Sequence, residues 1–251
     1  MNHRIIARLD IKKNDLIKGV QMEGWKKVGS PSIFAEKFYL SGADELLYMD
    51  VVASLYQRNN LKNIVSEVAE KVFIPITVGG GIDNLKSADE LMKSGADKLA
   101  INTAATKRPA LIKELSEYYG SQAVVVSIEA KKQQNSWTAM TDNGRNHTGL
   151  DVISWAAKCQ SLGAGEILIT SIDQDGTKKG PDIELIENIV KEIDIPVIYS
   201  GGFGNENHIK TALDLDLDAV ALASAIHYEL IELGKLKTSL FNQNYKIRPS
   251  Q

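Results

Sequence analysis

Short apolar runs alternate with longer amphipathic stretches along the whole chain. The short runs are rich in Ile, Val and Leu, which is typical of strands buried on both faces of a parallel sheet. The longer stretches carry apolar residues at helical spacing, and several of them end in glycine, as helices commonly do. Strands are predicted over residues 4–10, 45–51, 75–80, 98–102, 123–129, 166–172, 196–202 and 219–224. Helices are predicted over residues 61–72, 84–95, 108–120, 151–163, 182–193 and 205–216.

An internal repeat refines this alternation of strands and helices. PITVGGG at 75–81 matches PVIYSGG at 196–202, an offset of 121 residues, and the same offset aligns 96–104 with 217–225 and 43–49 with 164–170. Three matches at one spacing predict two half-barrels of four βα units each. Because no linker separates the halves, we expect one closed (β/α)₈ barrel domain over residues 1–251. A doubly wound open sheet is the structural alternative.

Composition narrows the classes of function. The formal net charge of -3 gives no global basic field for nucleic acid, and hydrophobic residues at 43% fit a sizeable globular core. The lone cysteine, Cys159, cannot form an internal disulfide, and we expect a buried, inert thiol in a reducing cytoplasm. MNHRIIARLD lacks the long apolar stretch of a signal peptide, and no apolar run nears the ~20 residues of a membrane span, so we expect a soluble protein. We also expect no cofactor and no metal site.

The strand ends carry small residues suited to binding phosphate. Backbone N–H groups at the ends of the last two strands of a barrel commonly hold this anion. Ser200–Gly202 and Ala223–Ser224 lie there, and the repeat places a twin at Gly79–Gly81 and Asn102–Thr103. Two such sites predict an elongated substrate with a phosphate at each end. A single glycine here would merely make a tight turn, but the paired arrangement recurs.

Two carboxylates are predicted to face each other at the same end of the barrel. Side chains alternate along a strand, so Arg4, Ile6, Arg8 and Asp10 share the inward face and Asp10 ends the row. Glu129 ends the fifth strand, opposite the first. Two carboxylates that flank a substrate can divide proton removal and donation between them. Capping of a turn is the alternative for either acid taken alone.

The chain resembles the cyclase subunit of imidazole glycerol phosphate synthase over essentially its whole length. RIIARLDIKKNDLIKGV, PITVGGGI, GADKLAINTAA and GAGEILITSIDQDGT carry this resemblance. It implies a (β/α)₈ barrel that takes ammonia from a glutaminase partner, as a heterodimer. It also implies a reaction of histidine biosynthesis, in which the ribulosyl nucleotide PRFAR, a bisphosphate, yields imidazole glycerol phosphate and AICAR.

The resemblance also implies roles for individual residues. Asp10 matches the first catalytic aspartate of the family, and Lys18 matches a lysine of a mobile first loop, here residues 11–30, which we expect to act as a lid. A solvated loop is the alternative for this segment. The implied phosphate-binding residues are Gly81 and Thr103 at one site and Gly202, Ala223 and Ser224 at the other. The implied substrate-positioning residues are Asp50, Asn102, Thr170 and Asp175.

Four charged residues begin inward-facing rows at the opposite end of the predicted barrel: Arg4, Glu45, Lys98 and Glu166. Buried charges are costly unless they are paired, and two acids with two bases would form a neutral ring. The resemblance implies that this ring is the gate for ammonia and that Asp97 contacts the glutaminase. Charges solvated at the strand starts are the alternative.

Two positions depart from the family pattern. Glu129 stands where the family normally has aspartate, and Arg8 stands where it usually has a small residue such as cysteine. A buried guanidinium needs a carboxylate partner, and Glu129 and Asp10 are the candidates. Three alternatives to the ring-closing synthase therefore stay open: an ammonia-channelling subunit for amidation of a surface-sugar precursor, a non-catalytic conduit, and the single-chain isomerase of the same pathway.

Overall fold

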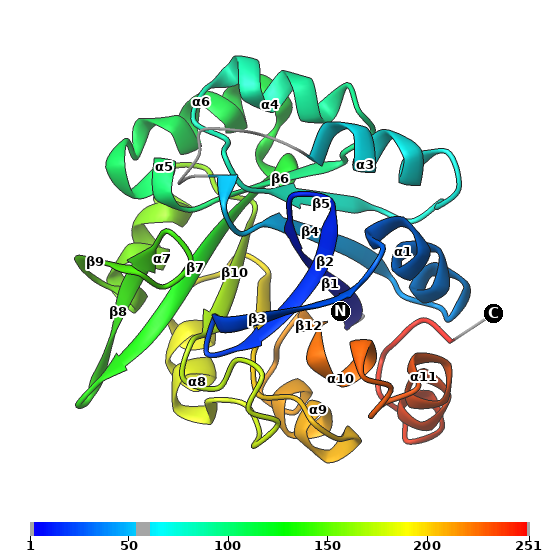
Figure 1. Ribbon diagram of the computed structural model, residues 1–251. Helices are drawn as coiled ribbons and strands as arrows, with labels where there is room; N and C mark the ends of the chain where they lie inside the picture. Colours follow the sequence, from blue (N-terminus) through cyan, green and yellow to red (C-terminus); the bar gives the residue numbers. More distant parts are fainter. Residues whose placement is uncertain (1–2, 54–60, 250–251) are drawn as a thin grey trace.

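The computed structural model describes residues 3–53 and 61–249, in which eight parallel strands close into a barrel surrounded by helices (Figure 1). Each strand pairs with the next, and β12 pairs with β1 to complete the closure. The strands are β1 (Arg4–Lys12), β4 (Glu45–Asp50), β5 (Ile76–Gly79), β6 (Lys98–Ile101), β7 (Val124–Gln133), β10 (Glu166–Ser171), β11 (Val197–Ser200) and β12 (Ala219–Leu222). All eight predicted strands and the (β/α)₈ architecture are confirmed, and the open sheet is wrong.

Helices cover the outside of the barrel and include the six that the sequence predicts. These six are α3 (Leu61–Ala69), α4 (Leu85–Met92), α6 (Ala110–Tyr119), α7 (Val152–Ser161), α8 (Ile183–Glu192) and α9 (Glu206–Leu213). Four further helices are not among the predicted ones: α1 (Pro31–Leu40), α11 (Leu233–Asn242) and the short helices α5 (Thr103–Lys107) and α10 (Ser224–His227). Pro31 at the first turn of α1, after Ser30, is a helix-start signal that could have found that helix.

Two antiparallel hairpins extend from the barrel, and one of them lies in the segment 11–30 that is expected to act as a lid. The strands β2 (Asp15–Val20) and β3 (Glu23–Gly29) continue from β1, and β8 (Ser136–Thr141) and β9 (Asn146–Asp151) continue from β7 (Figure 1). Asn143-Gly144 lies between β8 and β9, and Asn-Gly is a strong hairpin signal in a sequence. Most of the segment 11–30 therefore forms an ordered hairpin rather than a solvated loop.

Strand alternation divides the apolar side chains into two cores. Ile5, Ala7 and Leu9 face outward and pack in the large core between the barrel and its helices, as predicted from their parity. The inward-facing core fills the middle of the barrel and comprises Ile6, Leu47, Ala100, Val125, Leu168, Ile198, Ala219 and Ala221. Charged inward-facing residues are therefore confined to the two ends of the barrel.

The structure preserves the repeat in its backbone. Asn102 and Ala223, 121 residues apart, have nearly the same unusual conformation, with φ and ψ of -134° and -86° in one and -126° and -90° in the other. Asn84 and Asn205 have the same separation, and each caps the helix that follows through its side chain. The two half-barrels thus share local geometry as well as sequence.

Two further expectations concern the core and the membrane. Cys159 is fully buried, as expected, and burial raises the pKa of its thiol to about 12, which disfavours the reactive thiolate. Among the described helices, none is long and apolar enough to cross a bilayer.

A buried ion pair attaches α11 to the N-terminal end of the barrel. The Lys237 side chain is fully buried, and its Nζ donates to the Gly42 carbonyl at 2.8 Å and to Asp44 Oδ1 at 2.7 Å. The other oxygen of Asp44 accepts the backbone N–H of Ile5 at 2.9 Å. One carboxylate therefore connects the last helix to the first strand.

We expect Lys237→Met to lower the free energy of unfolding by about 3 kcal/mol, because it leaves a buried carboxylate without its main cation. Lys235→Met, on the exposed side of the same helix, is the matched control and should change stability by less than about 0.5 kcal/mol. Urea denaturation of both variants measures the difference. Equal effects would show that the buried pair does not stabilise the docking of α11.

Candidate active site

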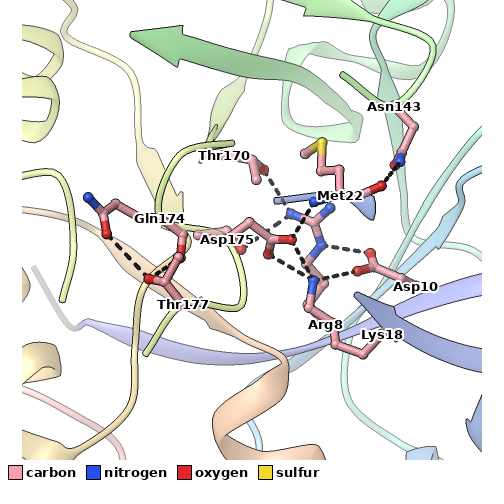
Figure 2. Close-up of polar contacts among 10 residues, drawn as sticks. Arg8, Asp10, Lys18, Met22, Asn143, Thr170, Gln174, Asp175 and Thr177 are labelled. Carbon is pink, nitrogen blue, oxygen red and sulfur yellow. Dashed lines mark hydrogen bonds and ion pairs between the residues drawn. The ribbon is translucent and has the colours of Figure 1, made fainter. Parts of the chain in front are cut away.

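Asp10 lies at the C-terminal mouth of the barrel between two cations. Arg8 Nε donates to Asp10 Oδ1 at 2.9 Å, and Lys18 Nζ lies 3.2 Å from Oδ2 (Figure 2). Burial alone would raise the pKa of this carboxyl, but the charges and hydrogen bonds of Arg8 and Lys18 outweigh it and hold the pKa well below its ordinary value. Asp10 is therefore ionised at any physiological pH.

Arg8 points up the inside of the barrel toward this mouth. Its Nη1 donates to Thr170 Oγ1 at 2.7 Å and to Ser200 Oγ at 3.3 Å, while its Nε is bound to Asp10. Of the two partners that the sequence suggested for the buried guanidinium, Asp10 forms the ion pair and Glu129 does not. Glu129 as the ion-pair partner of the Arg8 guanidinium is therefore wrong.

Glu129 occupies the opposite side of the mouth in a different environment. Its Oε2 accepts the backbone N–H of Gly144 at 2.8 Å, and the Asn102 side chain donates a second hydrogen bond. Burial raises the pKa of Glu129 to about 7, against the lowering effects of the Gly144 hydrogen bond and the Arg8 charge, while Asp142 raises it further. Glu129 can thus gain or lose a proton near neutral pH.

The β2–β3 hairpin covers the mouth. Lys18 is buried, and its Nζ lies 2.8 Å from Asp175 Oδ1, on the loop after β10 (Figure 2). The backbone N–H of Gln21 donates to the Asp175 carbonyl at 2.8 Å, and Asn143 donates to the Met22 carbonyl at 3.2 Å. The segment predicted as a lid therefore bonds to two other loops of the mouth in this closed conformation.

The first predicted phosphate site lies beside a cavity of about 230 Å³. The loop after β5 and the start of α5 line it, together with Glu129 and Arg8. Asp50 is buried in this wall, where its Oδ1 accepts the backbone N–H of Val52 at 3.0 Å. The predicted residues that the structure brings together here are Asp50, Gly81, Asn102, Thr103 and Glu129.

The second predicted phosphate site is smaller. Its cavity is about 20 Å³, with Asp175 and Gly176 on the side of the hairpin. Gly202 has φ of +84°, and a Cβ atom there would lie 1.9 Å from the Gly180 carbonyl oxygen, so the backbone requires glycine. The predicted residues gathered here are Asp175, Gly202, Ala223 and Ser224, whereas Thr170 lies deeper and accepts from Arg8.

The four predicted charges at the other end of the barrel form a ring. Arg4 lies 2.9 Å from Glu45 and 3.0 Å from Glu166, and Lys98 lies 3.1 Å from Glu45 and 3.2 Å from Glu166. Glu45 is almost completely buried and Lys98 is mostly so. Each charge therefore has two opposite neighbours, and the alternative of separately solvated charges is wrong.

Asp97 lies beside this ring with an intramolecular partner. Its carboxylate is exposed and accepts the backbone N–H of Ile76 at 2.8 Å. Asp218, 121 residues later, accepts the N–H of Val197 at the same distance. Both acids thus fasten the start of a neighbouring strand, which is a structural role that sequence reasoning missed for Asp97.

Sequence reasoning also missed the contribution of the β8–β9 turn. Gly144 donates to Glu129, and Asn143 holds the hairpin. In the described ranges, no three His, Cys, Asp or Glu side chains are grouped so that they could hold a metal ion.

Comparisons with known proteins agree on one family. A family model described as "Histidine biosynthesis protein" matches residues 4–232. A Legionella pneumophila protein named imidazole glycerol phosphate synthase subunit HisF is 59% identical over 204 residues, covering 81% of this chain and 96% of its own length. Proteins of the same name from Bacillus cereus (strain ATCC 10987 / NRS 248) and Petrotoga mobilis are each 44% identical, with 98% and 99% of both chains covered.

The raised pKa of Glu129 predicts a pH-dependent effect on stability. Above its ordinary value of 4.5 and up to about 7, the folded protein binds this proton more tightly than the unfolded chain does, so deprotonation disfavours the fold as pH rises through that window. We expect the stability of Glu129→Gln relative to the parent to rise by about 2–3 kcal/mol between about pH 5 and about pH 8.5. Urea denaturation at both pH values measures this change. Glu187→Gln, on the exposed face of α8, is the control, and a parallel shift in both variants would contradict the assignment.

Proposed function

The chain belongs to the histidine biosynthesis protein family as an imidazole glycerol phosphate synthase subunit of the HisF type, and from this premise we propose that Asp10 and Glu129 are its catalytic carboxylates. The enzyme is a cyclase and lyase of histidine biosynthesis, whose reaction converts PRFAR and ammonia into imidazole glycerol phosphate and AICAR. The observation that carries the proposal is the placement of two buried carboxylates across one mouth in opposite environments.

The chemistry explains why acids are needed at this place. When ammonia adds to a carbonyl carbon, a C–N bond forms, the nitrogen loses protons, and the carbonyl oxygen gains them and leaves as water. A side chain that accepts and returns protons, next to one that stabilises positive charge on nitrogen, lowers the barriers of both steps. Glu129 and Asp10 have these two properties.

The substrate spans the mouth in this proposal. One phosphate binds at Gly81, Asn102 and Thr103, and the other binds at Gly202, Ala223 and Ser224, where backbone N–H groups at helix starts favour an anion. The second cavity holds only about 20 Å³ while the hairpin is closed, so the hairpin opens to admit substrate. Lys18 then returns with the hairpin to the reacting centre. The remaining positioning residues are Asp50, Thr170 and Asp175.

Ammonia enters from the opposite end. The chain is a subunit of a complex, and we propose a glutaminase as its heterodimeric partner, docked over the ring of Arg4, Glu45, Lys98 and Glu166, with Asp97 on the same surface. The apolar middle layer of the barrel would carry ammonia uncharged, because an apolar environment disfavours ammonium. The whole chain, residues 1–251, would act as one domain in the cytoplasm.

The other hypotheses account for less of the molecule. An isomerase that uses no ammonia does not need a ring of paired charges across the barrel. A non-catalytic conduit does not need two buried carboxylates at the mouth. The names of the relatives favour ring closure over amidation of a surface-sugar precursor.

We expect the purified protein, supplied with an ammonium salt at alkaline pH, to consume PRFAR. Asp10→Asn and Glu129→Gln should each lower kcat by about 100- to 10,000-fold, because each removes a group that acts on protons or charge in the reaction. Both variants should still bind PRFAR, measured by calorimetry. Turnover that survives in either variant would remove that residue from the catalytic pair.

A second experiment tests the charge ring. Lys98→Met leaves two carboxylates that share one cation, which should disturb the passage between the two active sites. In a complex reconstituted with the glutaminase, the ratio of glutamine-dependent to ammonia-dependent turnover should fall on the order of tenfold, a usual size for coupling between sites. Lys93→Met, in an exposed pair with Asp89, is the control. An unchanged ratio in Lys98→Met would argue against a gate.

A further inference from the structure

Of the two carboxylates Asp10 and Glu129, Asp10 forms the ion pair with Arg8 and Glu129 does not. We propose that Arg8 is a positioning residue that keeps Asp10 ionised throughout the reaction, so that proton transfer in this site falls to Glu129 alone. The inference rests on the proposed function, because it assigns separate tasks to the pair named there.

Arg8 is held where it can do this. It lies on β1 two residues before Asp10, on the same inward face, and only 4% of its surface is exposed. Its Nε binds Asp10 at 2.9 Å, while Thr170 and Ser200 accept from Nη1 on the far side. Because hydroxyl groups from β10 and β11 fix the guanidinium, it cannot swing toward Glu129 without losing these partners.

The balance of buried charge at the mouth supports the same division. Arg8 and Lys18 supply two cations, and Asp10 and Asp175 supply two anions, each within 3.2 Å of a cation. This group of four is neutral as it stands. Glu129 is an acid outside this group, and its hydrogen bonds come from the neutral donors Gly144 and Asn102.

An ionised Glu129 would therefore be a buried charge without a paired cation, which is costly. Its protonated form avoids this cost, and the two forms balance near neutral pH, where its pKa lies at about 7. Arg8 does lower the pKa of Glu129 through its charge, but burial outweighs that effect. Asp10 cannot exchange a proton in the same range, because its pKa is held well below the ordinary value.

Other titratable groups lie near Asp10 and Glu129, and they leave Asp10 ionised and the pKa of Glu129 raised. Asp142, on the turn after β8, repels a negative charge on Glu129 and so favours its protonated form. Burial lowers the pKa of His227 on α10 to about 4, so this neighbour of Asp10 is neutral in the working range. The cavity beside Glu129 is also lined by Asp50 from β4 and Lys107 from α5.

The proton balance follows from these positions. Glu129 as a carboxylate takes a proton from the nitrogen that has attacked the substrate carbon. As a carboxylic acid it then gives that proton to the former carbonyl oxygen, which becomes a hydroxyl. A second transfer of the same kind, from the nitrogen to this hydroxyl, lets the oxygen leave as water while the C=N bond forms, and Glu129 ends in its starting form. Asp10 stays an anion and stabilises the positive charge that develops on nitrogen, which needs no proton of its own.

A carboxyl titration tests the proposal without turnover. The side-chain carboxyl carbons of Asp and Glu are labelled with ¹³C and followed by NMR against pH, and Asp10→Asn and Glu129→Gln identify the two signals. In the parent protein, we expect the Asp10 signal to stay that of the ionised form down to about pH 4, while Glu129 titrates near 7. A midpoint for Asp10 above about 5 would overturn the proposal, and this result needs no variant of Arg8.

Variants of Arg8 sharpen the test. Arg8→Met should raise the Asp10 midpoint by about 1–3 units, because it removes the adjacent cation, whereas Arg8→Lys keeps a cation and should restore most of the shift. Arg248→Met, an arginine at the other end of the barrel, is the matched control and should leave Asp10 unchanged. An Asp10 midpoint that is the same in folded Arg8→Met as in the parent would also overturn the proposal.

The pH dependence of kcat, measured at constant free ammonia, gives an independent readout. In the parent, the pH profile of kcat should show one ionisation near pH 7, that of Glu129. In Arg8→Met, the profile should show a second ionisation at lower pH, that of Asp10, below which kcat falls a further tenfold for each pH unit. The same profile in both proteins would contradict the role of Arg8. No turnover by the parent would instead overturn the proposed function, while the NMR titration would still decide the role of Arg8.

Discussion

The alternation of side chains along strands that close into a barrel governs the rest of this structure. Every second residue of each strand must point into a narrow interior, so a charge at such a position is buried unless it lies at a barrel end. The chain places its inward-facing charges at both ends and keeps the middle apolar, from Ile6 to Leu168. The ring that includes Arg4 and Glu45 closes one end, and the network around Asp10 closes the other.

Each end neutralises its charges by a different arrangement. At the N-terminal end, two acids and two bases alternate, so that every charge has two opposite neighbours. At the mouth, the four paired charges leave Glu129 outside the balance, bonded to the backbone of the β8–β9 turn. Burial raises the pKa of this carboxyl to about 7, so Glu129 can exchange a proton near neutral pH while the four paired charges stay as they are.

Arg8 and Glu129, the two departures from the family pattern, both affect the charges at the mouth. Arg8 adds a cation beneath the mouth, and it pairs with Asp10 rather than with the longer acid. The carboxylate of Glu129 instead accepts the backbone N–H of Gly144. The β2–β3 hairpin completes the network, because its Lys18 bonds to both Asp10 and Asp175. The charge of Lys18 thereby helps to hold the pKa of Asp10 below its ordinary value.

The strands, the repeat and the inward-facing rows could be predicted from the amino-acid sequence, because apolar spacing and strand parity are local properties that need no partner. It therefore placed Asp10 opposite Glu129 and grouped Lys98 with its three ring partners. It did not find α1 or the turn that binds Glu129, although Pro31 and Asn143-Gly144 carried local signals for both. Which acid pairs with Arg8 could be seen only in the folded molecule, since both acids were within reach on strand parity alone. That choice depends on the hydroxyl groups of Thr170 and Ser200, which lie more than 160 residues away and fix the direction of the guanidinium.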